Sequence, residues 1–459
     1  MRILLYTRHN ATDWFRYIAS NLKVASKTLI MSELRNEGDV SITDDFYRFY
    51  RQPDIAVQAF NKFGETECNE IIARCRLLRN LKKRKAMKMI GAAWQACLVL
   101  IDKFDPDMFL AFRIDSYVLD IIDRILKERG VPYIGLWRAA IVPNMVFITT
   151  RGEYTPLREP GEEEIQQCIS RITSPDFQAT SLKKNAKYDF LNFLKKYTYS
   201  NVRDCFLEIQ RSIVRDPQGY RYLTTHHHVP EYRLGFSNRH LVNYMREDWS
   251  AVFEATPFEK RIFIGLQVNP EATIDYYVKN LALINYERVL FRIIDTLEKT
   301  GYRIFLKDHP NMFGRRSIEF IRTIAGKPSV VLVPYNVLSN LLVMESRATF
   351  TWTGTIGLQA SMAGRCPIVV DPTYLMPGAF LQIQSPDDIA TLPERIRAFR
   401  TPSDLATIRR ETARHVLRAF IPGSMKWKEF KQNSPGAIQG ADMLISSLNT
   451  YLPRFLHRG

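Results

Sequence analysis

The chain has 459 residues, of which 46% are hydrophobic and 24% are charged, and its formal net charge is +16. This composition excludes a disordered or fibrous protein, and the length exceeds what one hydrophobic core usually supports, so two domains of about 200 residues each are expected. The excess of positive charge predicts an anionic partner, namely nucleic acid, an anionic membrane surface or a polyanionic substrate.

The N-terminal half alternates strand-like and helix-like segments. The clearest unit is a buried strand at residues 108–112, then an amphipathic helix at 117–129 that Gly130 closes, then another strand. Repeated units of this kind predict a parallel sheet. Further strands are expected at residues 2–7, 28–31, 131–136 and 146–149. The N-terminus has no signal-peptide pattern and the longest apolar run, residues 89–101, is too short to cross a membrane, so a cytoplasmic protein is expected.

A second regular alternation begins near residue 260, after a middle segment (183–258) in which we expect helices that bridge two lobes. Strands are predicted at 261–265, 302–306, 330–333, 348–351 and 367–370, with helices at 286–300, 316–325, 337–346 and 356–362. Short connections between these elements predict a doubly wound domain. We therefore place an N-terminal domain at 1–255, a nucleotide-binding domain at 256–425, and a helical segment at 426–459 that packs back on the N-terminal domain.

Two motifs in the second domain each follow a strand, at the edge where open parallel sheets bind ligands. In one, Pro310 makes a rigid corner that presents the ammonium of Lys307 and the imidazole of His309. The other opens a helix, whose free N–H groups and hydroxyls suit a phosphate. The alternatives are a helix cap at Thr353 or Thr355 and a loop histidine bonded to a neighbouring carbonyl. The residues predicted to bind the phosphate of a nucleotide are Gln267, Lys307, His309, Pro310, Thr353, Gly354, Thr355 and Gly357.

Two carboxylates are candidates for acid–base chemistry. Asp115 follows the strand at 108–112 and is the preferred general base or nucleophile, with a helix cap as the alternative. Glu271 follows the strand at 261–265, where it could bind a sugar hydroxyl or act as an acid or base; the alternative is a carboxylate that stabilises a helix N-terminus. Arg113 and Arg138 are predicted to bind an anionic sugar or acceptor, although a surface arginine is the simpler account of Arg138.

A run of cations without an acid precedes the apolar residues 89–100, and it suits an anionic membrane face or a solvated helix face. No nucleic-acid motif accompanies it, so nucleic acid is not an expected partner. No metal site is expected either, because the adjacent His226, His227 and His228 do not share a face and the six cysteines contain no CxxC pair. The cations are Arg74, Arg76, Arg79, Lys82, Lys83, Arg84, Lys85 and Lys88.

The C-terminal half resembles the GT-B glycosyltransferases of capsule and surface polysaccharide biosynthesis, including the Kdo transferases. The resemblance rests on residues 266–271, 307–311 and 353–360 with Gly364 and Pro367, and more weakly on residues 143–154. It implies two Rossmann-like domains that face a cleft, a nucleotide sugar on the C-terminal domain, an acceptor on the N-terminal domain, and no metal or other cofactor. In similar enzymes with CMP-activated sugars, a His-Pro motif and a Ser/Thr-rich helix start hold the phosphate. This maps onto His309, Thr353 and Thr355, although Thr-Gly-Thr replaces the more usual Ser-Ser or Ser-Thr pair.

These patterns together predict a metal-independent glycosyltransferase, peripheral at the inner face of the cytoplasmic membrane. It would move a sugar, Kdo or a related acidic sugar from a CMP donor, onto a cell-surface polysaccharide or a lipid-linked glycan. The alternatives are a glycosyltransferase with a UDP or GDP donor, a CDP-polyol phosphotransferase, a sugar-nucleotide epimerase, and a non-catalytic assembly factor.

Overall fold

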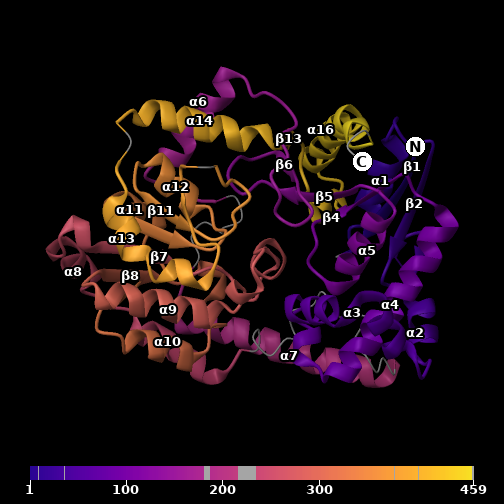
Figure 1. Ribbon diagram of the computed structural model, residues 1–459, viewed down its shortest axis with the longest axis horizontal. Coiled ribbons are helices and arrows are strands. Elements are labelled where there is room, and N and C mark those ends of the chain that lie inside the picture. Colours follow the sequence, from indigo (N-terminus) through magenta and orange to yellow (C-terminus); the bar gives the residue numbers. More distant parts are fainter. Residues whose placement is uncertain are drawn as a thin grey trace. The chain divides into compact units, whose positions relative to one another are not determined.

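The computed structural model describes residues 1–456 except His9, Asn36, 180–186, 215–233, Pro377 and Pro402, and only the backbone of residues 207, 208 and 210–214. The described residues form two compact units, shown in Figure 1. The first unit comprises residues 1–159 and 418–456, and the second comprises residues 160–417.

This division differs from the predicted boundaries at residues 255 and 425. Residues 160–255 group with the second unit, where the ring of Phe253 in α8 (Trp249–Ala255) packs 4.6 Å from the ring of Phe305 in the central sheet. The chain returns to the first unit at Arg418, because β13 (Phe420–Pro422) pairs with a strand of the first sheet. Pairing between segments so distant in sequence leaves no local signal.

The first unit is built on a seven-stranded sheet in the order β13-β6-β5-β4-β1-β2-β3. Strands β1 to β5 are parallel, whereas β6 runs antiparallel to β5, and β13 antiparallel to β6. The connection at residues 139–144 explains this departure from the expected parallel sheet, because a parallel crossover needs about a dozen residues or more. The strands are β1 (Arg2–Thr7), β2 (Lys27–Ser32), β3 (Val40–Ser41), β4 (Met108–Phe112), β5 (Tyr133–Arg138) and β6 (Met145–Ile148).

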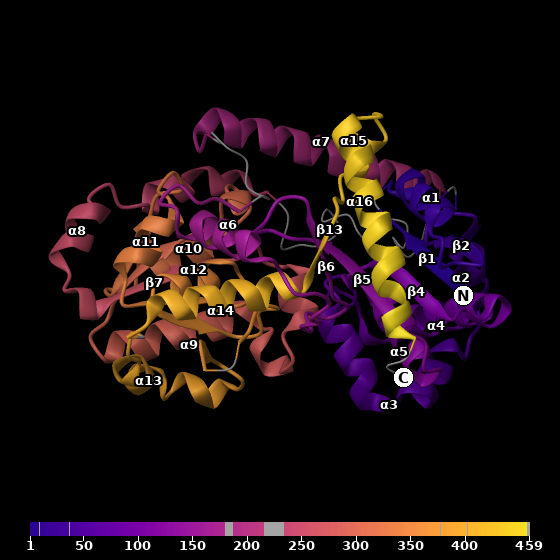
Figure 2. The ribbon, with the colours of Figure 1, turned by 90° about the horizontal axis from the view of Figure 1, so that it is seen from above.

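Helices cover this sheet, and the last long helix of the chain is one of them. Leu444 and Leu448 of α16 (Pro435–Tyr451) share a core with Trp14 of α1 (Thr12–Asn21) and with Ile3 and Leu5 of β1. Figure 2 shows α16 lying along the sheet of the first unit. The remaining helices of the unit are α2 (Thr43–Tyr50), α3 (Ile55–Arg74), α4 (Lys83–Phe104), α5 (Tyr117–Glu128) and α15 (Trp427–Phe430).

The predicted basic membrane face looks different once folded. The apolar residues of α4, among them Met89, Ile90 and Ile101, are buried in the first unit. Arg74 is buried and pairs with Glu70, and Lys83 lies 3.4 Å from Glu65, so the fold supplies acids that the segment itself lacks. Within the described ranges, no helix is both long and apolar enough to cross a membrane.

The second unit has a fully parallel sheet of six strands in the order β12-β11-β10-β7-β8-β9. Helices α9 (Tyr286–Lys299) and α10 (Ile318–Ala325) cover one face, and α8, α11 (Ser339–Glu345) and α12 (Ile356–Met362) cover the other, as Figure 1 shows. The strands are β7 (Arg261–Gly265), β8 (Arg303–Lys307), β9 (Val330–Val333), β10 (Ala348–Thr351), β11 (Cys366–Val369) and β12 (Leu381–Gln382). The other helices are α6 (Glu162–Thr173), α7 (Phe190–Val214), α13 (Leu392–Ala398) and α14 (Leu405–Arg418).

The prediction of an α/β protein with two Rossmann-like units is confirmed by these two sheets. In the second sheet the chain order reverses between β7 and β10, and in the first it reverses between β1 and β4. Ligands of open α/β sheets bind outside the carboxyl ends of the strands at such a reversal. Ligands are therefore expected to bind at these two edges.

Candidate functional site

The side chain of Gln267 links the loops that follow β7 and β10, at the position where the strand order of the second sheet reverses. Its side-chain Oε1 accepts a hydrogen bond from the Thr353 N–H (2.7 Å), and its Nε2 donates to the Thr353 hydroxyl (2.8 Å). Its backbone N–H donates to the Tyr286 hydroxyl (3.0 Å). Gln267 and Thr353, both predicted to bind the ligand, are therefore hydrogen-bonded to each other. Their side chains fix the two loops at this edge of the sheet.

Asp308 fixes the loop that follows β8. Its carboxylate accepts hydrogen bonds from the guanidinium of Arg316 (2.8 Å), the hydroxyl of Tyr335 (2.6 Å) and the backbone N–H of His309 (2.8 Å). Arg316 also donates to the Gln267 carbonyl (2.7 Å) and is 5% exposed. This buried ion pair sets the backbone from which Lys307 and His309 project.

His309 is held as a neutral hydrogen-bond donor. Its Nδ1 accepts from the backbone N–H of Asn311 (3.1 Å), which assigns the proton of the neutral ring to Nε2. Burial lowers the pKa of His309 to about 4, so the ring carries no charge at neutral pH in the ligand-free protein. The sequence offered the alternative that the His309 ring bonds to a neighbouring carbonyl. In the structure the ring accepts a hydrogen bond from the Asn311 N–H instead. Pro310 follows at the first position of a short 3₁₀ turn and supports the corner.

Lys307 is the last residue of β8, one residue beyond the predicted strand end, and only 4% of it is exposed. Burial lowers its pKa to about 8, and no ion pair of Lys307 is found among the described residues. Side chains two apart on a strand share a face, so Lys307 lies on the face of Phe305, which packs with Ala360 of α12. A buried cation of this kind is costly for folding and is characteristic of a functional site.

At the start of α12, Thr355 keeps its hydroxyl and its N–H available for a ligand. Among the described residues, neither the hydroxyl nor the N–H of Thr355 has a recorded hydrogen bond, and Thr355 makes no side-chain cap. The Gly354 N–H donates to the Thr351 hydroxyl (3.2 Å). Gly357 is required for packing, since a Cβ there would lie 2.6 Å from the Tyr374 hydroxyl. Of the four residues predicted here, Thr355 is therefore the one best placed for a phosphate.

Glu271 lies beyond β7 on the same edge of the second sheet. Its carbonyl accepts hydrogen bonds from the N–H groups of Ile274 (3.0 Å) and Asp275 (2.9 Å), and its side chain is half-buried. The backbone of Glu271 thus opens the π-helical turn Thr273–Tyr277.

The edge of the first sheet gathers a charged cluster around Asp115. Arg8, which follows β1 and is 1% exposed, pairs through Nη1 with Asp115 and through Nε with Glu33 (3.1 Å). Arg76 donates to the carbonyl of Asp115 (3.1 Å). Ser116 occupies the cap of α5 and accepts from the Leu119 N–H, so the alternative of Asp115 as the cap is wrong.

Sequence reasoning missed Arg8 and Glu33. Arg8 directly follows β1 and Glu33 directly follows β2. Asp115 was predicted for the same reason, because it lies after the carboxyl end of a parallel strand. Burial would lower the pKa of Arg8, but Asp115 and Glu33 outweigh it and raise that pKa. The cluster therefore contains a permanent cation beside the candidate base.

Arg113 directly follows β4 and Arg138 is the last residue of the neighbouring strand β5, so both lie at the same edge of the sheet. The Arg113 guanidinium lies 3.8 Å from the centre of the Trp137 ring and is buried, whereas more of Arg138 is exposed. Partial burial and then the positive charge of Arg113 lower the pKa of Arg138. Two guanidinium groups that influence each other in this way favour an anion at the edge.

Within the part of the chain that the structure describes, no group of three or more His, Cys, Asp or Glu side chains is arranged to hold a metal ion. His226, His227 and His228 lie outside the described residues.

No protein-family model and no curated protein matches the chain. Among solved structures, the KpsC β-Kdo 2,7 transferase of Thermosulfurimonas dismutans shares 12% identity over 97% of this chain and 99% of that chain, with a TM-score of 0.37. A UDP-GlcNAc 2-epimerase of Methanocaldococcus jannaschii shares 10% identity over 91% and 98%, with a TM-score of 0.29. The glycosyltransferase of kitacinnamycin shares 12% identity over 95% and 99%, with a TM-score of 0.26. Likeness at this level assigns no family, so the site geometry carries the functional argument.

Proposed function

We propose that the chain is a glycosyltransferase whose second unit binds a nucleotide sugar at the edge between β7 and β10. The observation that carries this proposal is the buried Lys307, which forms no ion pair with the described residues and lies on the edge that also presents His309 and Thr355. A departing nucleotide gains negative charge on its phosphate. A fixed ammonium, an imidazole N–H and the hydroxyl and N–H of a threonine would stabilise that charge.

The donor is proposed to be a CMP-linked sugar, Kdo or a related acidic sugar, with no further cofactor. The support is the resemblance of Lys307-Asp308-His309-Pro310 and Thr353-Gly354-Thr355 to the phosphate-binding motifs of CMP-dependent enzymes. A UDP or GDP donor would need the same contacts to phosphate, so the nucleotide base is the feature to test.

Nucleotide binding tests the proposal directly. Thermal unfolding of the wild type with CMP, CDP, UDP and GDP should show stabilisation by one of them, about 2.7 kcal/mol when its concentration is 100 times the Kd. His309→Ala should lose most of this stabilisation because the Nε2–H donor is gone. His240→Ala, at an exposed histidine of the same unit, is the matched control and should retain it. If no nucleotide stabilises the wild type, the proposal fails.

Asp115 is proposed as the general base that activates the acceptor hydroxyl, with its ion pair to Arg8 fixing the position of the carboxylate and with Arg113 and Arg138 binding an anionic group. Glu271 is the alternative base. Asp115→Asn should lower the rate of sugar transfer by a factor of about 10² to 10⁴ while leaving nucleotide binding intact. Asp13→Asn, at an exposed carboxylate of the same unit, should leave the rate unchanged. An unchanged rate in Asp115→Asn would move the role to Glu271.

Product analysis separates the alternatives. Free sugar plus nucleotide monophosphate from a donor without acceptor indicates a glycosyltransferase, a released polyol phosphate indicates a phosphotransferase, and an intact sugar nucleotide with an inverted centre indicates an epimerase. An assembly factor would keep its function in His309→Ala.

The proposed acceptor is a glycan or a lipid-linked glycan, and the proposed surface partner is an anionic membrane. Because the apolar side of α4 is buried, exposed Lys82 and Arg84 would attract the membrane electrostatically.

A further inference from the structure

Helix α7 of the second unit has apolar side chains on two opposite faces. On the inner face, Phe193 is 1% exposed and shares a core with Phe313 and Tyr335, and Tyr197, one turn further along, packs against the same core. Ser200 continues this buried face. Packing inside the unit therefore accounts for one face of the helix.

The outer face of α7 is also apolar, although it is in contact with solvent. With 3.6 residues per turn, its five large apolar side chains lie within about 120° of one another and opposite Phe193. Four of the five are more than half exposed. These outer-face residues are Leu191 (67% exposed), Leu194 (37%), Val202 (64%), Phe206 (63%) and Ile209 (55%). A contiguous exposed apolar patch of this kind marks an interaction surface.

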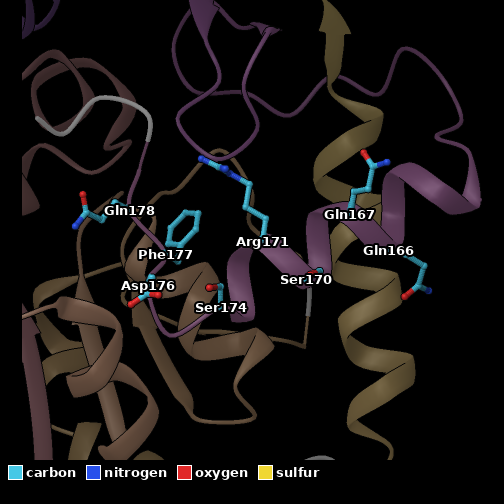
Figure 3. A pocket seen from close by; sticks show the side chains of 8 residues that line it. All are labelled: Gln166, Gln167, Ser170, Arg171, Ser174, Asp176, Phe177 and Gln178. Carbon is cyan, nitrogen blue, oxygen red and sulfur yellow. The ribbon is translucent and has the colours of Figure 1, made fainter. Parts of the chain in front are cut away.

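Helix α6 of the same unit shows the ordinary pattern of a surface helix. Its apolar side chains, such as Ile165 and Ile172, are buried, and the exposed positions between them are polar. Figure 3 shows Gln166, Gln167 and Ser170 of this polar side beside a cavity of about 860 Å³. A helix with one apolar face is fully satisfied by the core it covers. The second apolar face of α7 therefore needs a partner outside the unit.

The charges on α7 select the kind of partner. Lys195 is exposed and lies within the same sector as the outer-face residues, and Arg203 flanks this sector. Among the side chains of α7 that the structure describes, the one acid, Asp204, lies on the inner side. The whole chain carries a formal charge of +16. Like charges oppose the docking of a second copy on this face, whereas anionic lipid headgroups attract it.

The inner face of α7 leads to the loop of the proposed donor site. The ring of Tyr188, just before α7, stacks on Tyr335 with centres 5.1 Å apart, and the Tyr335 hydroxyl donates to Asp308 (2.6 Å). Phe193 packs with Phe313, which ends the short turn after His309. Because a helix with its side chains is about 10–12 Å across, a surface on the outer face would lie about that far from this loop.

We infer that α7 docks its outer face on an anionic membrane, with the five apolar side chains inserted below the headgroups. The inference rests on the proposed function, because a membrane in this position would carry a lipid-linked acceptor close to the donor site. The long stem of Lys195 lies along the apolar surface and its ammonium reaches the headgroups. Apolar insertion together with electrostatic attraction binds a membrane more firmly than either does alone.

Sedimentation of the full chain with vesicles tests this contact. The wild type should bind vesicles of equal parts phosphatidylglycerol and phosphatidylcholine at least about tenfold more tightly than vesicles of phosphatidylcholine alone. Leu191→Gln combined with Val202→Gln should lower the partition coefficient on the anionic vesicles at least about tenfold. The matched control, Leu281→Gln combined with Leu341→Gln, changes two other exposed leucines of the unit (39% and 51%) and should leave it unchanged. Equal melting temperatures show that both variants fold.

The inference is overturned if the wild type does not sediment with the anionic vesicles, or if the double variant in α7 binds them as tightly as the wild type. It is also overturned if sedimentation velocity shows a dimer that this variant converts to a monomer, since a second copy would then occupy the face.

Nucleotide stabilisation, measured on the same proteins, separates these outcomes from failure of the proposed function. The double variant in α7 should keep the nucleotide effect, and His309→Ala should keep vesicle binding. Nucleotide binding without vesicle binding rejects the membrane contact alone, whereas vesicle binding without nucleotide binding rejects the donor site alone.

Discussion

Lys307→Met is expected to make the protein more stable at pH 7. Burial lowers the pKa of Lys307 from 10.5 to about 8, so the folded protein binds its proton less tightly than the unfolded chain does. Below pH 8 both states are protonated and the folded state carries the full cost of the buried charge, up to about 3 kcal/mol. Between pH 8 and 10.5 the folded state releases the proton and this cost declines. The stabilisation by methionine should therefore be greatest at pH 7 and nearly gone at pH 10.5.

Urea unfolding of wild type and variant at a series of pH values measures this difference. The same variant should lose nucleotide stabilisation, because the ammonium that destabilises the fold is the proposed ligand of phosphate. Lys299→Met, at an exposed lysine in the last turn of α9, should change neither property. If Lys307→Met destabilises the protein at pH 7, Lys307 is a structural residue and its proposed role is wrong.

Arg316→Met is expected to destabilise the protein by about 3–5 kcal/mol, because it leaves the carboxylate of Asp308 buried without its cation. Loss of the bond to the Gln267 carbonyl adds to the effect. The free energy of unfolding in urea gives the measurement. The matched control is Arg246→Met, which breaks an exposed pair with Asp248 in the same unit and should cost less than about 1 kcal/mol.

The double variant Asp308→Asn, Arg316→Met separates two causes of the destabilisation. One is the loss of the attraction between Arg316 and Asp308, and the other is the cost of a buried Asp308 carboxylate without a cation. With the carboxylate neutralised, much of the stability lost in Arg316→Met should return, and the two single changes should not be additive. Additive losses would show that Arg316 acts through packing, for example against Phe320, rather than through its charge.

The second sheet could be predicted closely because buried parallel strands are short apolar runs between loops. Strands β7, β9 and β10 have the expected bounds, and β8 is shifted by one residue at both ends, to Arg303–Lys307. The strand β13 could not be predicted, because its partner β6 lies far away in the sequence. The same limit hides from the sequence the return of the chain to the first unit at Arg418.

For the candidate sites, the residues at the sheet edges could be predicted from the sequence. Which of them are available to a ligand and which stabilise the fold could not. Thr353 and Thr355 look alike in the sequence, yet only Thr353 is engaged by Gln267. Gly357 suits a phosphate loop in the sequence, whereas in the fold it allows close contact with Tyr374. The Arg8–Asp115 pair joins residues from two distant strands, and such pairs become visible only in the folded chain.

In each sheet, a pair of bonded side chains links the two loops at the position where the strand order reverses; we call each pair a clamp. The two clamps differ in charge. Arg8 and Asp115 form an ionic clamp in the first unit, whereas Gln267 and Thr353 form a neutral one in the second. The Gln267–Thr353 pair adds no net charge at its edge, so it does not oppose the attraction between Lys307 and an incoming phosphate. It also keeps the loops ordered before a ligand arrives, so little of the binding free energy is spent on fixing them.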